Sequence, residues 1–317
     1  MASASPPQAP PSQRFIGPGM AGLFSLLVFA SLGVLPLVGV FLALLAPLPL
    51  VHVTATGRPS FLAWGWVAVT LVGAVLVWHQ VWLVAVAAGY LMVAVWPAVS
   101  VEIWLRRPWS TGRWAAIVAT VALAVAAGVM FAVFQPTAPA DALTDALTRG
   151  AGASDLLKKL GEAAGSEELV AQAIHTAAYL APAAAALYVL WAAFWLRPRL
   201  ALLGLPRGSE PIARYSSEEW LPVGFALGGV GWVFAPEPFK WLAANLLVTV
   251  LGLYFVHGLA IIFFYLGRRF SGNRLVRLGV LVFALQIPVA LVFSALGLVD
   301  AFFRLRRGGA DDGGVEA

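Results

Sequence analysis

Long apolar runs separated by short polar turns cover most of the chain. Residues 251–270, LGLYFVHGLAIIFFYLGRRF, are apolar almost throughout and carry one imidazole, His257, near their middle. An α-helix rises 1.5 Å per residue, so about 20 apolar residues cross the hydrocarbon core of a bilayer, which is roughly 30 Å thick. Runs of this length predict transmembrane helices.

The pattern of runs predicts an all-α fold, a polytopic transmembrane helical bundle of eight or nine hydrophobic segments. Residues 20–54 are too long for one span, and Gly33 and Pro36 interrupt them, so we expect a tight helical pair broken near Pro36. Each of the remaining runs has the length of about one span. They lie at residues 61–79, 80–104, 113–134, 173–196, 219–235, 239–267 and 275–300.

Two tails flank the predicted helical domain, which covers residues 19–306. Residues 1–18 are rich in Pro, Ser, Ala and Gln, and residues 307–317 are rich in Gly and Asp. Such segments contain too little apolar surface to fold, so both tails are predicted to be disordered. The tail at 1–18 is expected to lie in the cytoplasm.

Composition supports a membrane location. The 317 residues are 61% hydrophobic and 11% charged, with a mean hydropathy of +0.88. Soluble domains contain roughly 25% charged residues, so this chain lacks the polar surface that a water-facing globule needs. The absence of cysteine excludes disulfides, thiolate metal sites and cysteine nucleophiles.

Basic residues predict the orientation. A cytoplasmic N-terminus places the arginine clusters at 106–113, 197–214 and 268–277 on the inner side, as the positive-inside rule requires. We therefore expect a multi-pass protein of the bacterial cytoplasmic (inner) membrane. Nine full spans would place the C-terminal arginines outside, so the span count and the side of the C-terminus stay open. The outer side then holds only Arg149, Lys158, Lys159 and Lys240.

The segment 136–172 is the one sizeable polar stretch between spans and is predicted to be extracytoplasmic. Its sequence suggests short amphipathic helices capped by Asp or Ser. A connector lying on the membrane surface is the favoured interpretation, and a ligand lid or partner site is the alternative.

The sequence contains no recognisable catalytic equipment. Of its four histidines none has a histidine or acidic partner at i+4, and no HExxH, GxSxG, phosphate-loop or dinucleotide motif is present. The spans also lack paired carboxylates. We therefore expect no enzymatic activity, no cofactor and no metal site. The net charge of +5 is explained by loop arginines at a membrane, so we expect no nucleic-acid partner.

The run 239–267 carries the polar residues that most need explanation. At 100° per residue, Tyr254, His257 and Tyr265 share one face, and Asn245 lies on the opposite face. Side chains of this kind avoid lipid, so this helix is expected to be central. We take these four residues as candidate ligand-binding residues. Two alternatives stay open: His257 hydrogen-bonded to a backbone or hydroxyl group, and Asn245 with Gly252 at a helix–helix contact.

The last run, with the sequence LQIPVALVFSALGLVDAFFRLRR, predicts a kink at Pro288. Gly297, Asp300 and Arg304 share one face of this helix. Because Asp300 and Arg304 are separated by four residues, they can form an ion pair that anchors the helix end at the lipid headgroups.

Three stretches resemble one family: APLPLVHVTATGRPS (46–60), NLLVTVLGLYFVHGLAI (245–261) and LGLVDAFFRLR (296–306). They are similar to the bacterial membrane proteins of domain-of-unknown-function family 2232, also called YybS-like. The resemblance covers most of residues 20–306. The positions that fit the family pattern are Pro47, Pro49, Gly57, Arg58, Asn245, Gly258, Gly297, Asp300 and Arg304.

The front half of that family is similar to the substrate-binding membrane subunits of energy-coupling-factor vitamin transporters. The resemblance implies a small-solute-binding transport subunit that depends on a partner ATPase, because this chain has no Walker motif. The alternative is a structural or accessory membrane protein that organises partners and binds no ligand. A cavity with convergent polar groups would favour the first interpretation.

Overall fold

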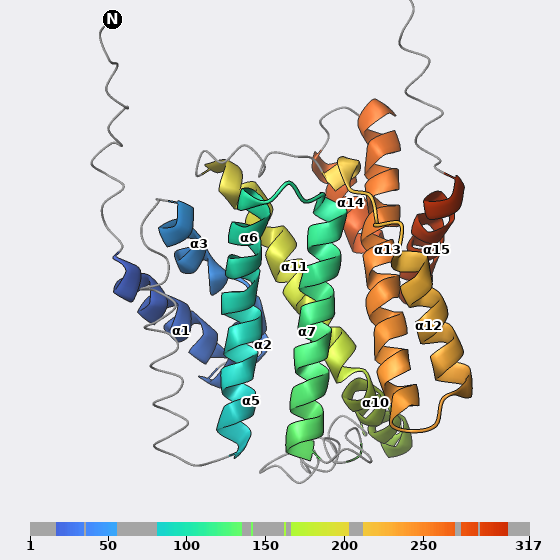
Figure 1. Cartoon of the computed structure of the whole chain (residues 1–317), viewed down its shortest axis with the longest axis horizontal. Helices are drawn as coiled ribbons and strands as arrows, with labels where there is room; N and C mark the ends of the chain where they lie inside the picture. Colours follow the sequence, from blue (N-terminus) through green and yellow to red (C-terminus); the bar gives the residue numbers. More distant parts are fainter. Residues whose placement is uncertain are drawn as a thin grey trace, which may run out of the picture. The chain divides into compact units, whose positions relative to one another are not determined.

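The computed structural model describes residues 17–34, 36–55, 81–134, 141, 162, 166–202, 212–269, 274–284 and 286–303. Within these residues every regular element is a helix, which confirms the predicted all-α class (Figure 1). The predicted segment at 61–79, the residues beyond 303 and most of both tails and of the segment 136–172 lie outside the described residues.

Fewer helices than expected have the length of a full span. Among the described residues, three helices are long and apolar enough to cross a membrane: Val86–Arg106, Thr111–Ala132 and Phe239–Gly267. Two bent pairs raise the number to five if each pair counts as one span. The prediction of eight or nine segments is therefore not confirmed. Several apolar runs form helices shorter than one span, namely Gly19–Leu32, Val38–Val53 and Leu221–Phe234.

The chain divides into two compact units. The first comprises Met1–Arg106 with Ala192–Gly208, and the second comprises Arg107–Trp191 with Ser209–Ala317. Among the described residues, the first unit contains the last part of α11 (Ala181–Leu202) and six further elements: α1 (Pro18–Val34), α2 (Pro36–Ala43), α3 (Pro47–Ala55), α5 (Val81–Tyr90), the π-helix η2 (Leu91–Val95) and α6 (Trp96–Arg106).

Prolines divide the start of the first unit. Pro36 and Pro47 each stand at the first position of a helix, where the missing N–H leaves no hydrogen bond unmade. Residues 20–54 consequently form parts of three short helices, whereas the sequence predicted a pair; the predicted break at Pro36 is confirmed. In the same unit, buried Tyr90 donates a hydrogen bond to Ser25 over 2.9 Å and joins α5 to α1.

The second unit is built on α13 (Phe239–Arg269), its longest helix. Helices α12 (Leu221–Phe234) and α15 (Ile287–Phe303) run beside it (Figure 1). The remaining elements are α7 (Thr111–Phe134), α10 (Glu167–Tyr179), the first part of α11 (Ala181–Leu202), the short 3₁₀-helix η4 (Ile212–Arg214) and α14 (Arg274–Ala284).

Glycines allow α13 and α15 to approach closely. A Cβ atom on Gly258 would overlap the carbonyl oxygen of Phe293, and one on Gly297 would overlap that of Tyr254. Small residues at such crossings bring two backbones within contact, which is a common way for helices to associate in membranes. Both glycines are positions that fit the family pattern, and this contact gives a physical reason for them.

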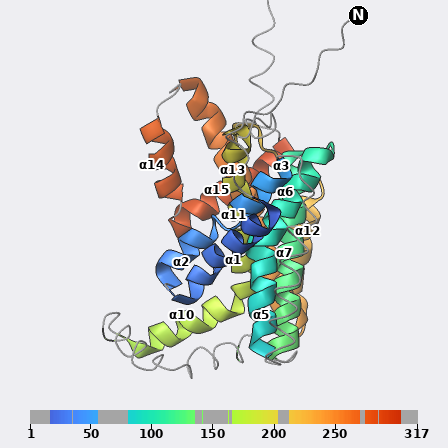
Figure 2. The same ribbon diagram turned by 90° about the vertical axis from the view of Figure 1, so that its left-hand side faces the viewer.

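Two bends interrupt the apolar runs of this unit. Helices α10 and α11 meet at 65° around Leu180, so α10 leads away from the axis of α11 (Figure 2). Ser166 caps α10 by accepting a hydrogen bond from the Leu169 N–H over 3.3 Å, which confirms the predicted serine cap. Helices α14 and α15 meet at 101°, and Pro288 stands at the second position of α15. The predicted kink is confirmed, and the predicted span at 275–300 is two helices.

Candidate functional site

Three side chains that carry a charge or an imidazole are buried among the described residues: Arg197, His257 and Asp300. Arg197 belongs to the first unit, where its guanidinium lies over the rings of Trp104 and Phe194, 5.4 and 5.7 Å from their centres. His257 and Asp300 lie in the second unit and contact each other. Because ionisable residues are costly inside a membrane, a buried pair of this kind is a candidate functional site.

The close crossing of α13 and α15 brings His257 and Asp300 together. The Nε2 atom of His257 lies 2.8 Å from Oδ2 of Asp300, and the two side chains are only 3% and 6% exposed. The crossing glycines, Gly258 and Gly297, place the two backbones close enough for this bond. His257 therefore has an acidic partner that helical spacing within one run did not reveal.

A loop residue completes the other side of the imidazole. The hydroxyl oxygen of Ser217 lies 2.8 Å from Nδ1 of His257, and the Ser217 backbone N–H donates to the same nitrogen over 3.4 Å. A backbone N–H can only donate, so Nδ1 is the accepting nitrogen of a neutral ring. The ring proton then lies on Nε2 and is donated to Asp300. The three side chains form one hydrogen-bonded row from the loop to α15.

The loop that carries Ser217 is fixed against the start of α7. Ser110 caps this helix by accepting from the Arg113 N–H over 3.0 Å, and its hydroxyl donates to the Glu218 carboxylate. A Cβ atom on Gly112 would overlap the Ser216 carbonyl oxygen, so the loop backbone lies directly on α7. The ring of buried Tyr215 lies edge-on to His257, 6.1 Å between centres. These contacts determine where Ser217 meets the imidazole.

The row contains the residue types of a hydrolytic triad but joins them through different nitrogens. In that triad the serine bonds Nε2 and the aspartate bonds Nδ1. Here Ser217 bonds Nδ1, and its own backbone N–H competes for the same nitrogen. A nucleophilic serine also requires a substrate cleft and oxyanion donors. What the described geometry does provide is a chain of donors and acceptors that can hold and move a proton.

The four candidate ligand residues have different surroundings in the described part of the chain. Tyr254 and His257 are buried, whereas Tyr265 on the same face is 47% exposed. The ring of Tyr254 packs edge-on to Phe225 of α12, and its hydroxyl has no hydrogen-bond partner among the described atoms. Asn245 lies at a different contact. A ligand role for these residues stays a prediction.

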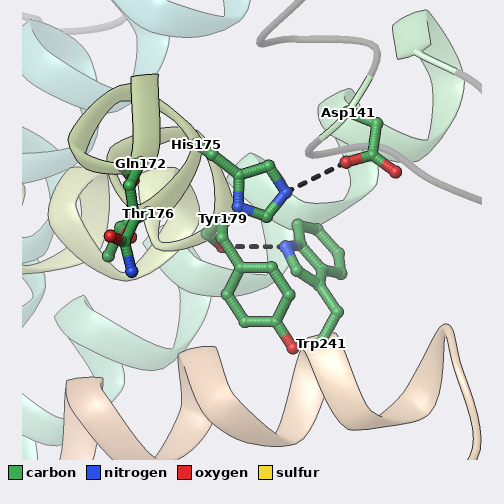
Figure 3. A network of polar contacts seen from close by, with 6 residues as sticks. All are labelled: Asp141, Gln172, His175, Thr176, Tyr179 and Trp241. Atoms are coloured by element: carbon green, nitrogen blue, oxygen red, sulfur yellow. Dashed lines mark hydrogen bonds and ion pairs between the residues drawn. The ribbon is translucent and has the colours of Figure 1, made fainter. Parts of the chain in front are cut away.

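Asn245 stabilises the bend between α10 and α11. Its Oδ1 accepts from the Ala183 N–H over 3.0 Å, and its Nδ2 donates to the carbonyls of Tyr179 and Trp241, both over 2.9 Å. The indole N–H of Trp241 also donates to the Tyr179 carbonyl, over 2.8 Å (Figure 3). Gly252 lies against Leu187 of α11. The predicted helix–helix contact of Asn245 and Gly252 is therefore confirmed.

An open depression of about 570 Å³ is lined by residues of α10, the bend and the start of α11. None of the four candidate ligand residues lines it. Nearby, exposed His175 of α10 contacts Asp141 over 3.0 Å (Figure 3). The lining residues are Leu169, Gln172, Ala173, Thr176, Ala177, Leu180 and Ala184.

The described residues include only some of the positions that fit the family pattern. Pro47 and Pro49 are buried in the first turn of α3, whereas Gly57, Arg58 and Arg304 lie outside the described residues. The predicted pair of Asp300 with Arg304 therefore cannot be placed, and the described partner of Asp300 is His257. Sequence reasoning missed Ser217 and Tyr215, because the loop ARYSSEEW carries no motif that predicts its return to α13.

Helices of membrane-spanning length and a buried ionisable row define an integral membrane protein built from apolar helices. The chain belongs to the family described as predicted membrane protein DUF2232, whose sequence pattern matches residues 22–301. This match confirms the resemblance to this family that three stretches of the sequence carry. No curated protein and no solved structure matches the chain.

Proposed function

We propose that this protein is a membrane transport subunit that binds a small solute and depends on a partner subunit. The observation that carries the proposal is the buried His257–Asp300 pair, bonded through Ser217 to a polar loop. Ionisable pairs within membrane-spanning helices are costly to bury and commonly mark substrate or proton pathways. The resemblance to energy-coupling-factor subunits supports a partner ATPase as the energy source.

The proposal includes that the protein is not an enzyme and uses no cofactor. Ser217 is the residue that could contradict this, because its hydroxyl contacts an imidazole. A fluorophosphonate probe reacts with activated serines, and we expect it to leave the purified protein unlabelled. Labelling that disappears in Ser217→Ala would overturn this part of the proposal.

The proposed location is the bacterial cytoplasmic membrane with the N-terminus inside. The distribution of arginines supports this orientation. Cysteines introduced at Ser154 and Ser271 would test it with a membrane-impermeant thiol reagent on intact cells. We expect labelling at position 154 and none at position 271; the reverse pattern would contradict the orientation.

A structural role without a ligand is the second candidate. It is supported by the direct backbone contact of α13 with α15 and by Asn245, whose side chain bonds only backbone groups. Such contacts hold helices in place. They give no reason for burying the charge of Asp300, which a purely structural contact does not need. For this reason transport is the preferred assignment.

The test is the identification of what the protein retains. The full chain, purified from its own membrane in mild detergent, is analysed by mass spectrometry for small molecules and associated proteins. We expect a small molecule and an ATPase subunit in wild type, and loss of the small molecule in His257→Gln. The exposed residue His175 offers a matched control, His175→Gln, which should retain both. A wild-type protein that retains no small molecule favours the structural role.

A further inference from the structure

We infer that His257 and Asp300 form a proton-binding site, and that binding of the proton weakens the attachment of residues 215–218 to α13. The inference deepens the proposed function, on which it rests, by naming the proton as the ion coupled to solute movement. It is carried by the geometry of the row: two 2.8 Å contacts that join a loop serine, a helix histidine and a helix aspartate.

The site has two protonation states that differ in charge. In the first, the neutral imidazole donates from Nε2 to the Asp300 carboxylate, and the pair carries one negative charge. In the second, a hydronium ion transfers its proton to Nδ1, and imidazolium with carboxylate sum to zero. One O–H bond of the hydronium ion breaks, one N–H bond forms, and a water molecule is released. Because the pair is buried, uptake and release of the proton both require water or a rearrangement of the surrounding residues.

The two states bond the loop differently. The neutral Nδ1 accepts from the Ser217 backbone N–H and faces its hydroxyl. A protonated Nδ1 is a donor, so the backbone N–H then meets another N–H and its bond is lost. The hydroxyl can turn and accept, which leaves one bond where two existed. The backbone contact is already long at 3.4 Å, so it is the weaker part of the attachment.

Ser217 also supplies the path to water. His257 is 2% exposed, whereas Ser217 is only partly buried in a loop whose neighbours include exposed polar groups. On α13 and the elements packed against it, the described residues carry these ionisable groups: Asp300 on α15, Lys240, Tyr254 and Tyr265 on α13 itself, Arg113 at the start of α7, Arg214 at the end of η4, and Tyr215, Glu218 and Glu219 in the loop. Glu218 already accepts from Ser110, so movement of Ser217 is transmitted to the start of α7.

Two measurements on the full chain in lipid nanodiscs of phosphatidylethanolamine and phosphatidylglycerol test the site. Nitrogen-15 NMR of labelled histidine rings reports the proton on Nδ1 directly, and His257→Gln assigns the signal. Hydrogen exchange of residues 212–220, corrected for the intrinsic pH dependence of amide exchange, reports the attachment of the loop. Both are followed from about pH 5 to about pH 8, the range in which histidines ordinarily titrate.

We expect the His257 signal to show protonation on acidification, together with loss of exchange protection at residues 215–218. The exchange transition should disappear in His257→Gln and persist in His175→Gln. In Asp300→Asn the midpoint should move to lower pH by about one unit or more, because the carboxylate that stabilises the imidazolium is gone. A His257 ring that stays neutral at the lowest pH, or a transition that persists in His257→Gln, would overturn the proton site.

The experiments distinguish failure of the proton site from failure of the proposed solute transport. A titrating site in a protein that retains no solute would support proton binding and contradict solute transport. A retained solute with no titration of His257 would contradict the proton site alone. The NMR signal is measured in wild type, so the result does not depend on whether a variant folds.

Discussion

Two histidine–aspartate pairs in the same unit have almost the same geometry and very different surroundings. His257 and Asp300 are joined over 2.8 Å with side chains 3% and 6% exposed, whereas His175 and Asp141 are joined over 3.0 Å with side chains 49% and 69% exposed. In the exposed pair, water solvates both partners whether or not they touch. In the buried pair, little water reaches either side chain, so both depend on contacts within the protein for their solvation.

The helices that hold each pair also differ. The buried pair is positioned by backbone contact, because Gly258 and Gly297 let α13 and α15 touch. The exposed histidine lies on α10, whose bend from α11 is held by hydrogen bonds from Asn245 and Trp241. Contact distance alone would make the two pairs equivalent. Burial and the backbone contact of the supporting helices make the first pair, and not the second, a candidate functional site.

The largest expected effect comes from separating α13 and α15. Gly258→Val places a branched side chain where the Phe293 carbonyl oxygen lies, so the backbones must move apart. Overpacking of this kind costs about 3 kcal/mol at the upper end of its usual range. We expect a large loss of monodisperse protein in fluorescence-detected size exclusion after heating, and loss of the His257 titration. The buried pair would then be shown to depend on the crossing.

Gly128→Ala is the matched control for this substitution. Among the described residues, no atom beyond the neighbouring turns of the helix lies within 4 Å of a Cβ atom built on Gly128, which stands midway along α7. Alanine is the better helix former by about 1 kcal/mol, so this variant should be as stable as wild type or more so. A Gly258→Val protein as stable as Gly128→Ala would contradict the close crossing.

The class of fold was predictable from the sequence, because apolar runs and the absence of strand-like alternation determine it locally. The predicted number of spans is not confirmed among the described residues, where the prolines and the bends at Leu180 and before Pro288 divide runs that hydropathy treats as continuous. For Asn245 the alternative interpretation, a helix contact, is confirmed, since an amide in an apolar run must find partners within the protein, and its ligand role stays a prediction. Its partners, backbone groups at a bend, were not predictable.

His257 and Asp300 are 43 residues apart in the sequence. Helical spacing predicts contacts only between residues three or four positions apart, so it could not predict this pair. The expected partner of Asp300 was therefore Arg304, within its own helix. The sequence did contain one signal of this contact, in Gly258 and Gly297. Gly258 is adjacent to His257, and Gly297 lies three residues before Asp300. Two such small residues beside buried polar ones indicate a crossing at which those polar groups meet. The loop with Ser217 carries no comparable signal.

The second largest effect is expected at the bend that supports the exposed pair. Asn245→Leu removes three hydrogen bonds to backbone groups of Ala183, Tyr179 and Trp241. At about 0.6 kcal/mol for each hydrogen bond in a membrane protein, the loss is about 2 kcal/mol. Heated size-exclusion profiles should show a clear decrease in stability while the His257 titration remains. The control is Thr249→Val, which removes one bond within α13 and should have less than half the effect.

Asp300→Asn probes the buried pair itself with little change of shape. The amide oxygen can still accept from His257 Nε2, so only the charge-assisted part of the bond is lost, about 1 kcal/mol. Combining it with His257→Gln should cost less than the sum of the single changes, because both disrupt the same contact. Thermal unfolding of the four proteins, measured by size exclusion, gives this coupling. Additive effects would show that the two side chains act independently.

The smallest effect is expected at the exposed pair. His175→Gln removes the imidazole that contacts Asp141, but both side chains are largely solvated and contribute little to stability through their contact. We expect a shift of about 1 °C or less in the unfolding temperature, and no change when the salt concentration is raised from about 0.1 M to about 1 M, where exposed charges are screened. The ring of Tyr179 lies near His175, 6.4 Å between centres, so His175→Ala would also remove an aromatic contact and is the less selective change. A His175→Gln shift as large as that of Asp300→Asn would break the comparison, because burial would then not be what distinguishes the two pairs.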